Sequence, residues 1–326
     1  MIRGPEVIVR VLISEFMDGA AVRELEREFD TEYAVQLADR RPELLAKVAG
    51  ADALIVRNRT RVDRELLEAA PRLRVVGRLG VGLDNIDVPA CEARGVEVIP
   101  ATGANASAVA EYVIATAMLL LRGAYTHTAA VAGGEWPRGA LSGGREIGGK
   151  VLGLLGFGGI GQLAARKAVA LGMRVLAHDP VLAAGAPVLR DAESVPLEEL
   201  LAESDVLSLH VPLTEDTRGL LDRDRLRRMK RGAILINTAR GAIVDEAAAV
   251  EMLEAGQLAG AAFDVFGREP VEPGSPWSRV ARAHNVILTP HIAGVTLESN
   301  ERVSALIARR VGECLRAGTR ESPCRS

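Results

Sequence analysis

The sequence has little of what metal sites, disulfide frameworks and membrane spans require. Three cysteines and five histidines are spread over 326 residues, with no C-x-x-C or H-E-x-x-H spacing. An odd number of unpaired cysteines indicates free thiols in a reducing compartment, and scattered histidines predict no metal. The longest apolar run, residues 113–121, is too short to cross a bilayer. We therefore expect a cytoplasmic protein that is neither membrane-bound nor metal-dependent.

The sequence also has no large excess of positive or negative charge. The formal net charge is -3, which leaves no basic surface for nucleic acid. The apolar run at residues 7–13 is broken by Arg10 and has no cleavage-like site after it, so we interpret it as a first strand and not as a signal peptide. With 326 residues, 48% of them hydrophobic, the chain is long enough for two domains.

Strand-like and helix-like segments alternate along the chain, which predicts α/β architecture with parallel sheets and helices on both faces. A mostly apolar helix at 106–121 must be buried, either between domains or in a subunit interface. The glycine-rich segment 133–150 is expected to form a loop or arm. The expected strands are 6–13, 53–57, 73–79, 96–99, 205–209, 233–237, 259–263 and 286–288, and further helices are expected at 18–28, 222–229, 245–255 and 298–316.

A glycine turn between a strand and a helix organises residues 151–180. Gly156, Gly158 and Gly161 have the G-x-G-x-x-G spacing that brings a pyrophosphate to a helix N-terminus. Asp179 ends the next strand, where a carboxylate can accept hydrogen bonds from a ribose 2′-hydroxyl and would repel a 2′-phosphate. Because no arginine follows Asp179, the motif predicts NAD as the cofactor and not NADP.

A second glycine motif, residues 144–150, matches the G-x-x-x-x-G-K pattern of a phosphate-binding P-loop. The next residue is Val151, where the P-loop needs Ser or Thr, and a strand follows where a helix is required. We therefore reject the P-loop interpretation.

Four residues after strand ends can perform hydride-transfer chemistry on a carbonyl: Arg240, Asp264, Glu269 and His291. Histidine is the natural proton carrier near neutral pH, a carboxylate beside it orients the ring, and an arginine can grip a substrate carboxylate. The alternatives are a surface role for Arg240, a solvated Glu269 and a structural His291. The histidines expected to be structural are His127, His210 and His284.

These motifs resemble the D-2-hydroxyacid dehydrogenase family, in its phosphoglycerate dehydrogenase-like branch. The resemblance rests on G-R-L-G-V-G-L-D-N-I-D at 77–87, the glycine turn, N-T-A-R-G at 237–241, D-V-F at 264–266 and P-H at 290–291. It implies two Rossmann-like, doubly wound parallel-sheet domains with a cleft between them. The substrate domain would comprise residues 1–102 plus 293–326, and the NAD-binding domain residues 103–292. The resemblance also implies a homodimer with the helix at 106–121 in its interface.

The resemblance further implies roles for individual residues. The family's catalytic Arg, Glu and His fall on Arg240, Glu269 and His291. Substrate contacts fall on Arg57, Asn58, Val81, Gly82, Asn105 and Arg240. Cofactor contacts fall on Gly156, Gly158, Gly159, Ile160, Gly161, Asp179, Val211, Pro212, Thr238, Ala239, Arg240, Asp264, His291 and Gly294.

The segment 57–61 carries three alternating arginines, Arg57, Arg59 and Arg61, which suit a substrate with a second anion on C3. The alternative is that Arg59 and Arg61 are solvated. Segments 13–18 and 57–61 also resemble the sulfolactate dehydrogenases of this family, which ranks (S)-3-sulfolactate first, then 3-phosphoglycerate, then glyoxylate or hydroxypyruvate. Many phosphoglycerate dehydrogenases carry a C-terminal regulatory domain, and this chain stops at Ser326 without one, which argues against serine feedback and, more weakly, against a role in serine synthesis. A non-catalytic NAD-sensing binding protein is the alternative from another class.

Overall fold

The computed structural model describes residues 8–182, 186–281 and 285–320. Contacts between residues divide the chain into a first unit, Met1–Asn105 with Val295–Ser326, and a second unit, Ala106–Gly294. All strand pairs in both sheets are parallel, as predicted for an α/β fold of two parallel sheets. His284 and Cys324, along with residues 6 and 7 of the first expected strand, lie outside the described residues.

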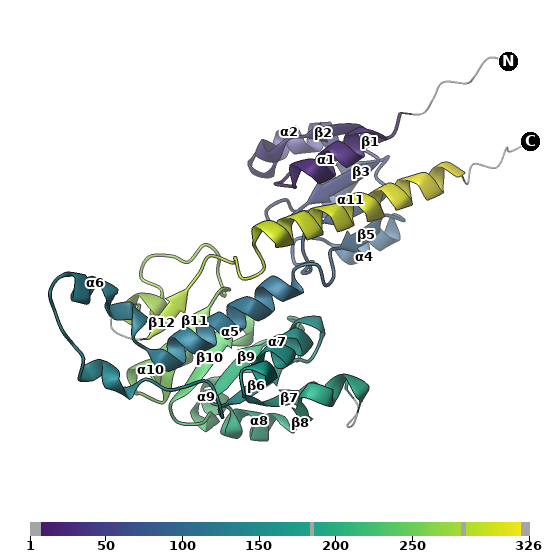
Figure 1. Ribbon diagram of the computed structural model, residues 1–326. Helices are drawn as coiled ribbons and strands as arrows, with labels where there is room; N and C mark the ends of the chain where they lie inside the picture. The colour runs from purple at the N-terminus through teal and green to yellow at the C-terminus, as the bar shows by residue number, and fades with distance from the viewer. Residues whose placement is uncertain (1–7, 183–185, 282–284, 321–326) are drawn as a thin grey trace, which may run out of the picture. The chain divides into compact units, whose positions relative to one another are not determined.

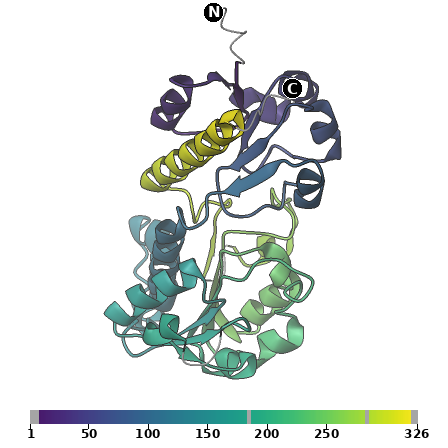
Figure 2. The same ribbon diagram turned by 90° about the vertical axis from the view of Figure 1, so that its right-hand side faces the viewer.

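The first unit is a five-stranded sheet in the order β2-β1-β3-β4-β5, with helices on both faces. Helices α1 and α11 pack together on one face, where Leu25 and Ile307 belong to one apolar core (Figure 2). Helices α2, α3 and α4 cover the other face around Leu44, Leu66 and Cys91. The bounds are β1 Arg10–Ile13, α1 Gly19–Glu26, β2 Asp30–Tyr33, α2 Arg41–Val48, β3 Ala53–Val56, α3 Arg64–Ala69, β4 Val75–Arg78, α4 Val88–Ala93, β5 Glu97–Pro100 and α11 Leu297–Arg320.

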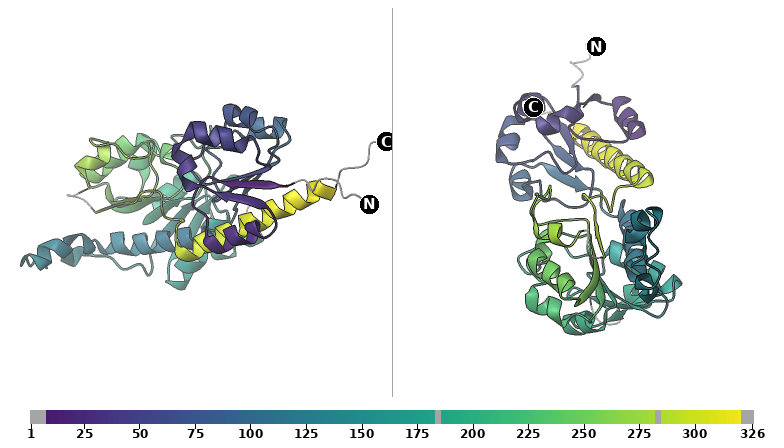
Figure 3. Two further views of the ribbon diagram at one scale, coloured as in Figure 1. Left: turned by 90° about the horizontal axis from the view of Figure 1, so that it is seen from above. Right: turned by 90° about the vertical axis from the view of Figure 1, so that its left-hand side faces the viewer.

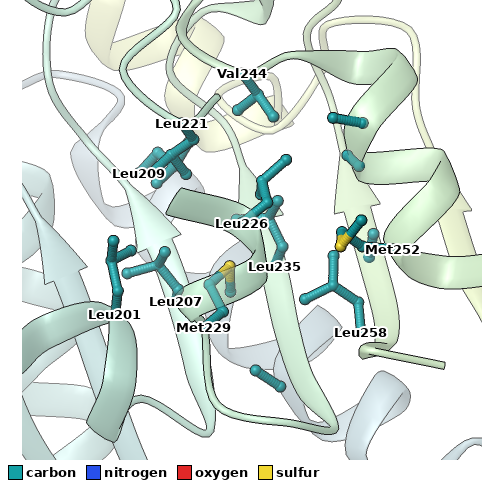
Figure 4. Close-up of a cluster of buried hydrophobic side chains, with 14 of the residues drawn as sticks. Leu201, Leu207, Leu209, Leu221, Leu226, Met229, Leu235, Val244, Met252 and Leu258 are labelled. Carbon is teal, nitrogen blue, oxygen red and sulfur yellow. The ribbon is translucent and has the colours of Figure 1, made fainter. Parts of the chain in front are cut away.

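The second unit is a seven-stranded sheet in the order β12-β11-β10-β9-β6-β7-β8. Helices α5 and α7 pack together on one face (Figure 1). Helices α8, α9 and α10 cover the other face over a core that includes Leu207, Leu226 and Leu235 (Figure 4). The bounds are α5 Ala106–Arg122, α6 Thr128–Ala132, β6 Val151–Leu155, α7 Gly159–Ala170, β7 Arg174–His178, β8 Glu193–Ser194, α8 Leu197–Glu203, β9 Val206–Leu209, α9 Arg223–Arg228, β10 Ala233–Asn237, α10 Glu246–Glu254, β11 Leu258–Phe263 and β12 Val286–Leu288.

Strand composition follows strand position in both sheets. Central strands such as β3 (ALIV) and β9 (VLSL) are buried along their whole length, as parallel strands covered on both faces must be. The edge strands β2 (DTEY) and β8 (ES) are polar, which suits strands with an open side. Helix starts are fixed by aspartate side chains that accept backbone N–H groups, at Asp18, Asp63, Asp87, Asp222 and Asp245.

The segment after α5 leaves the body of the second unit. Figure 3 shows this stretch, which carries α6, reaching outward from the seven-stranded sheet and its helices. Large apolar side chains on it are exposed to solvent, among them Tyr125 and Trp136. No helix in the described parts of the chain combines the length and apolar character that a membrane crossing needs.

Candidate active site

In the second unit, the predicted site residues gather along one edge of the sheet. Because the seven strands are parallel, their carboxyl ends share that edge, and ligands of open α/β sheets bind there, beside the point where the strand order reverses. Here the reversal lies at β6, whose neighbours are β7 and β9. Each strand except β8 is followed by predicted site residues or leads to them: Gly156 after β6, Asp179 after β7, Val211 and Pro212 after β9, Thr238 to Arg240 after β10, Asp264 after β11 and His291 after β12.

The glycine turn between β6 and α7 is tightly packed on one side and open on the other. Gly156 has a φ of 94°, and a Cβ on it would lie 2.8 Å from the carbonyl carbon of His210. A Cβ on Gly161 would lie 2.6 Å from the Gly156 carbonyl oxygen. A Cβ on Gly158 or Gly159 would meet nothing within 4 Å. The open side, at the start of α7, is where a pyrophosphate can approach the backbone.

Asp179 closes the same turn from the neighbouring strand. One oxygen of its carboxylate accepts the N–H of Phe157 at 2.9 Å, and the other accepts the N–H of Val181 at 3.1 Å. A carboxylate has about four lone-pair positions, so capacity remains for ribose hydroxyls. The position of Asp179 therefore fits the adenosine ribose of NAD.

Some buried side-chain atoms in the described residues lack a hydrogen-bond partner, and two of them belong to predicted site residues. Thr238 Oγ1 and Asn105 Oδ1 are buried and make no hydrogen bond within the described residues. Buried polar groups are normally paired, so an unpaired one at a strand end indicates a bound polar ligand. Thr238 follows β10, at the same edge of the sheet as the glycine turn. The carboxamide of a nicotinamide could form a hydrogen bond with its hydroxyl. The second unit therefore offers suitable groups for both halves of a nicotinamide dinucleotide, Asp179 for the adenosine ribose and Thr238 for the nicotinamide.

His291 and Glu269 form a direct pair. The Nδ1 atom of His291 lies 2.8 Å from Oε2 of Glu269, and Oε1 accepts the N–H of Phe266 at 3.0 Å. Burial raises the pKa of Glu269, but the hydrogen bonds from His291 and Phe266 and the charges of His291 and Arg240 outweigh it, so the carboxyl pKa is lowered. The side chain of His291 is 39% exposed, and the contact with Glu269 uses only one of its two ring nitrogens.

Asp264 holds the loop that presents His291. It is 1% exposed and accepts the N–H groups of Ile292 and Ala293, both at 2.8 Å, and the Thr289 hydroxyl at 2.6 Å. His291 itself has a φ of 56°, a left-handed conformation that non-glycine residues rarely adopt. The buried carboxylate therefore fixes an otherwise unfavourable backbone, and the predicted cofactor contact at Gly294 directly follows this loop.

A tyrosine from α5 completes that network. The hydroxyl of Tyr112 lies 2.7 Å from the Thr289 hydroxyl, which in turn donates to Asp264. Burial, opposed by the Thr289 hydrogen bond and reinforced by the charge of Asp264, raises the pKa of Tyr112. Tyr112 therefore stays protonated and can act as a donor in this chain of hydrogen bonds.

The loop that carries Arg240 is held by its own side chains and by close packing. The buried Asn237 donates to the Arg240 carbonyl at 2.9 Å and accepts the Ala239 N–H at 3.0 Å. A Cβ on Gly241 would lie 1.9 Å from the carbonyl carbon of Phe266. The Arg240 loop thus rests directly on the turn that leads to Glu269, and the charge of Arg240 contributes to the lowered pKa of that carboxyl.

The predicted substrate residues of the first unit also lie at strand ends. Arg57 and Asn58 follow β3, while Val81 and Gly82 follow β4, and β3 pairs with β4. The structure therefore brings these two loops to the same edge of the five-stranded sheet. Asn105 lies at the end of the continuous part of this unit.

The arginines of segment 57–61 have different surroundings. The Arg57 guanidinium donates to Asn300 Oδ1 at 3.1 Å and lies 6.0 Å from the centre of the Phe16 ring. Arg59 forms an ion pair with Asp39, and both side chains are more than half exposed. This placement favours the solvated alternative for Arg59, whereas Arg57 is the arginine held in place.

Several residues of these networks were not singled out from the sequence. Asn237 and Gly241 lie inside the N-T-A-R-G motif, and Thr289 directly precedes the P-H motif, so motif position is a usable signal for them. Tyr112 carries no local signal, because its partner Thr289 is distant in sequence.

The remaining histidines have ordinary structural surroundings where they are described. His210 lies 3.0 Å from the Ser208 hydroxyl through Nε2, and burial lowers its pKa to about 4. His178 Nδ1 lies 3.0 Å from the Val195 carbonyl oxygen. Within the described residues, no three His, Cys, Asp or Glu side chains gather where they could hold a metal ion.

Comparison with known proteins agrees with this geometry. Residues 114–293 match the family described as D-isomer specific 2-hydroxyacid dehydrogenase, NAD binding domain. The chain is 53% identical to (S)-sulfolactate dehydrogenase of Chromohalobacter salexigens over 94% of this chain and 98% of that protein. It is 38% identical to D-3-phosphoglycerate dehydrogenase of Archaeoglobus fulgidus over 93% of this chain, but spans only 56% of that protein.

Among solved structures, the TT0316 protein from Thermus thermophilus superposes with a TM-score of 0.86 at 38% identity, covering 95% of this chain and 97% of that one. The fold class, the family, the NAD cofactor and the enzyme class predicted from the sequence are thereby confirmed. The chain belongs to the D-isomer specific 2-hydroxyacid dehydrogenase family and is an NAD-dependent oxidoreductase of 2-hydroxy acids.

Proposed function

We propose that this enzyme interconverts (S)-3-sulfolactate and 3-sulfopyruvate. The observation that carries the proposal is the 53% identity to an (S)-sulfolactate dehydrogenase over nearly the whole of both chains. The firmly held Arg57 supports it, because a guanidinium is well suited to a sulfonate or phosphate on C3. 3-Phosphoglycerate is the second candidate, supported by the 38% identity to a phosphoglycerate dehydrogenase.

The proposed catalytic residues are Arg240, Glu269 and His291. NAD supplies or accepts the hydride. During reduction of the 2-oxo acid, His291 gives a proton from Nε2 to the carbonyl oxygen, and in the reverse direction it takes the proton from the hydroxyl. Glu269 binds Nδ1, which fixes the orientation of the ring. The two residues therefore act as one proton-transfer unit.

Arg240 supplies the fixed positive charge. A guanidinium can bind the substrate carboxylate with two hydrogen bonds and stabilise negative charge that develops on the carbonyl oxygen. The backbone N–H groups of Val81 and Gly82 are assigned to the same carboxylate, and Arg57, Asn58 and Asn105 to the rest of the substrate. The side-chain NH2 group of Asn105 can donate to the substrate, because the 2-oxo acid offers only acceptor oxygens.

The assignment of cofactor contacts follows the edge of the seven-stranded sheet. Gly158 and Gly159 leave room for the pyrophosphate, Asp179 binds the adenosine ribose, and Thr238 meets the carboxamide. The other proposed contacts are Gly156, Ile160, Gly161, Val211, Pro212, Ala239, Arg240, Asp264, His291 and Gly294. Of these, Asp264 contributes by shaping the 291–294 loop, because its carboxylate accepts the N–H groups of Ile292 and Ala293.

A homodimer belongs to the same proposal. Met118 and Leu119 on α5 are exposed, and so are Tyr125, Val131 and Trp136 in the segment that follows. Exposed large apolar side chains gathered on neighbouring segments mark an interaction surface, and a second copy would cover it. Light scattering should give twice the chain mass, and Trp136, which is 79% exposed, should be shielded from quenchers in solution.

A cytoplasmic location is proposed as well. Cys91 and Cys314 are free thiols, and burial raises the pKa of each to about 11, so both stay protonated and unreactive. Such thiols fit a reducing compartment. A thiol reagent should label the buried Cys91 only after unfolding.

The test of the substrate proposal is NADH oxidation with 3-sulfopyruvate, 3-phosphohydroxypyruvate, hydroxypyruvate, glyoxylate and pyruvate. We expect the highest kcat/KM for 3-sulfopyruvate, by about tenfold or more over acids without a C3 anion, because one charge-assisted contact has about that value. A preference for the phosphate would select the second candidate. Equal rates for all acids would indicate a general reductase, and tight NADH binding without turnover would indicate a sensor.

A further inference from the structure

A single buried carboxylate organises the loop after β3. Glu15 is 4% exposed and receives the backbone N–H groups of four successive residues, 57–60. Its Oε1 accepts from Arg57 at 2.8 Å and from Thr60 at 2.9 Å, and its Oε2 accepts from Asn58 at 3.2 Å. Arg59 donates to both oxygens. The loop therefore curls around one anion that belongs to the protein itself.

The carbonyl groups of the loop are engaged from the other side. Asn85 Nδ2 donates to the Arg57 carbonyl at 3.3 Å and to the Thr60 carbonyl at 2.6 Å. The Ser14 hydroxyl lies 2.9 Å from the Thr60 hydroxyl. Glu15 thus binds the N–H groups of the loop and Asn85 binds its carbonyl groups. The two residues come from segments that are distant in sequence.

These hydrogen bonds determine which donor groups of the loop remain available to an anionic ligand. Four successive N–H groups would form an anion-binding nest, but Glu15 already fills it. Only side chains remain, and Arg57 is the one with a fixed direction, through Asn300 and Phe16. Arg59 is instead paired on the surface with Asp39.

We propose that Glu15 is a positioning residue for substrate selection, which aims Arg57 at the C3 anion of the substrate by holding the 57–60 backbone. The inference rests on the proposed preference for C3-anionic acids. It differs from a purely structural role, because a fold-stabilising carboxylate would affect all substrates equally. A positioning carboxylate should affect only the acids that Arg57 recognises.

The test replaces the carboxylate by its amide, Glu15→Gln. An NH2 group in place of Oε2 cannot accept hydrogen bonds, so the N–H of Asn58 loses its acceptor and the N–H of Arg59 keeps only Oε1. We expect KM for 3-sulfopyruvate to rise about tenfold to hundredfold while kcat changes little. KM for glyoxylate should stay within about threefold, and the Kd of NADH, measured by fluorescence, should not change.

Two further variants sharpen the result. Asp39→Asn is the matched control, since it makes the same change on the carboxylate that pairs with Arg59, and it should leave both KM values within about twofold. In an Arg57→Ala background, Glu15→Gln should produce no additional loss of discrimination, because its target is gone. If Glu15→Gln folds poorly, Glu15→Asp keeps the charge and should show an intermediate KM.

The outcomes separate the two levels of the proposal. If the wild-type enzyme shows no preference for C3-anionic acids, the proposed substrate is wrong. If the wild type shows that preference and Glu15→Gln keeps it, or loses activity equally with every acid, the positioning role is overturned while the substrate proposal stands.

Discussion

The two sheets share one parallel architecture, but they hold their polar side chains in different ways. In the second unit, His291 and Glu269 bond directly to each other, and the loops around them are locked by Asp264 and Asn237. In the first unit, Glu15 locks only the backbone, and Arg57 touches an amide and an aromatic ring. Proton transfer needs fixed partners, whereas substrate selection needs a charge placed at a fixed point.

This comparison separates two kinds of failure. Substitutions in the second unit should lower kcat for every 2-oxo acid by the same factor, because the reacting carbonyl is common to all. Substitutions at Glu15 or Arg57 should change KM for only some acids. The following variants all lie in the second unit, and for each the ratio of kcat/KM between 3-sulfopyruvate and glyoxylate should stay constant.

The largest effect is expected for His291→Ala. Removal of the proton carrier should lower kcat by about a thousandfold or more, since general acid–base catalysis contributes about 10² to 10⁴. The Kd of NADH, from fluorescence titration, should remain close to that of the wild type. A variant that retains near-normal turnover would show that the proton comes from another group.

Glu269→Gln should lower kcat by about a hundredfold, because the histidine loses its orienting anion. The pH dependence follows from the lowered pKa of Glu269. A carboxyl whose pKa is lower in the folded state stabilises the fold above its unfolded pKa, about 4.3, and this contribution disappears as pH falls through the folded value.

The wild type should therefore be more stable than Glu269→Gln at neutral pH, and the difference should shrink below about pH 4. Urea unfolding of both proteins across this range measures it. A stability difference that is independent of pH would contradict a stabilising role for the Glu269 carboxylate in its contact with His291.

Gly241→Ala should lower kcat by about tenfold to a hundredfold. A Cβ would collide with the carbonyl carbon of Phe266, at 1.9 Å, and push the Glu269 turn away from the Arg240 loop. Gly139→Ala is the matched control, because a Cβ there meets nothing within 4 Å. Equal activity of both variants would mean that the two loops can separate without cost.

The smallest effect is expected for Tyr112→Phe, which removes one hydroxyl from the Thr289–Asp264 network. A single neutral hydrogen bond has a net value of about 0.5–1.5 kcal/mol, so kcat should fall about twofold to tenfold. Tyr125→Phe, which removes the hydroxyl of a tyrosine outside this network, is the control. An unchanged kcat in Tyr112→Phe would mean that only Thr289 and Asp264 contribute to the function of this network.

Most of the fold was predictable because buried parallel strands are apolar along their length. The expected strands 233–237 and 286–288 coincide with β10 and β12. β2, Asp30–Tyr33, was not predicted, because its DTEY sequence has no strand pattern and it forms only by pairing with β1.

The candidate site was predictable only where motifs report on local chemistry. The motifs name Arg240, Glu269 and His291, whose roles stay predictions until variants are measured. Glu15 could not be found in this way, because it acts on a loop 42 or more residues further along the chain. Its function depends on the pairing of β1 with β3, which local sequence does not encode.

The glycine turn has a consequence for how the chain tolerates mutation. Gly156 and Gly161 are required by the protein's own backbone, whereas Gly158 and Gly159 border open space. In a mutational scan that reads abundance and activity separately, alanine at 156 or 161 would reduce the amount of protein. Alanine at 158 or 159 would leave normal amounts of a protein that no longer retains its dinucleotide. One short turn thus meets two independent requirements, one from folding and one from the ligand.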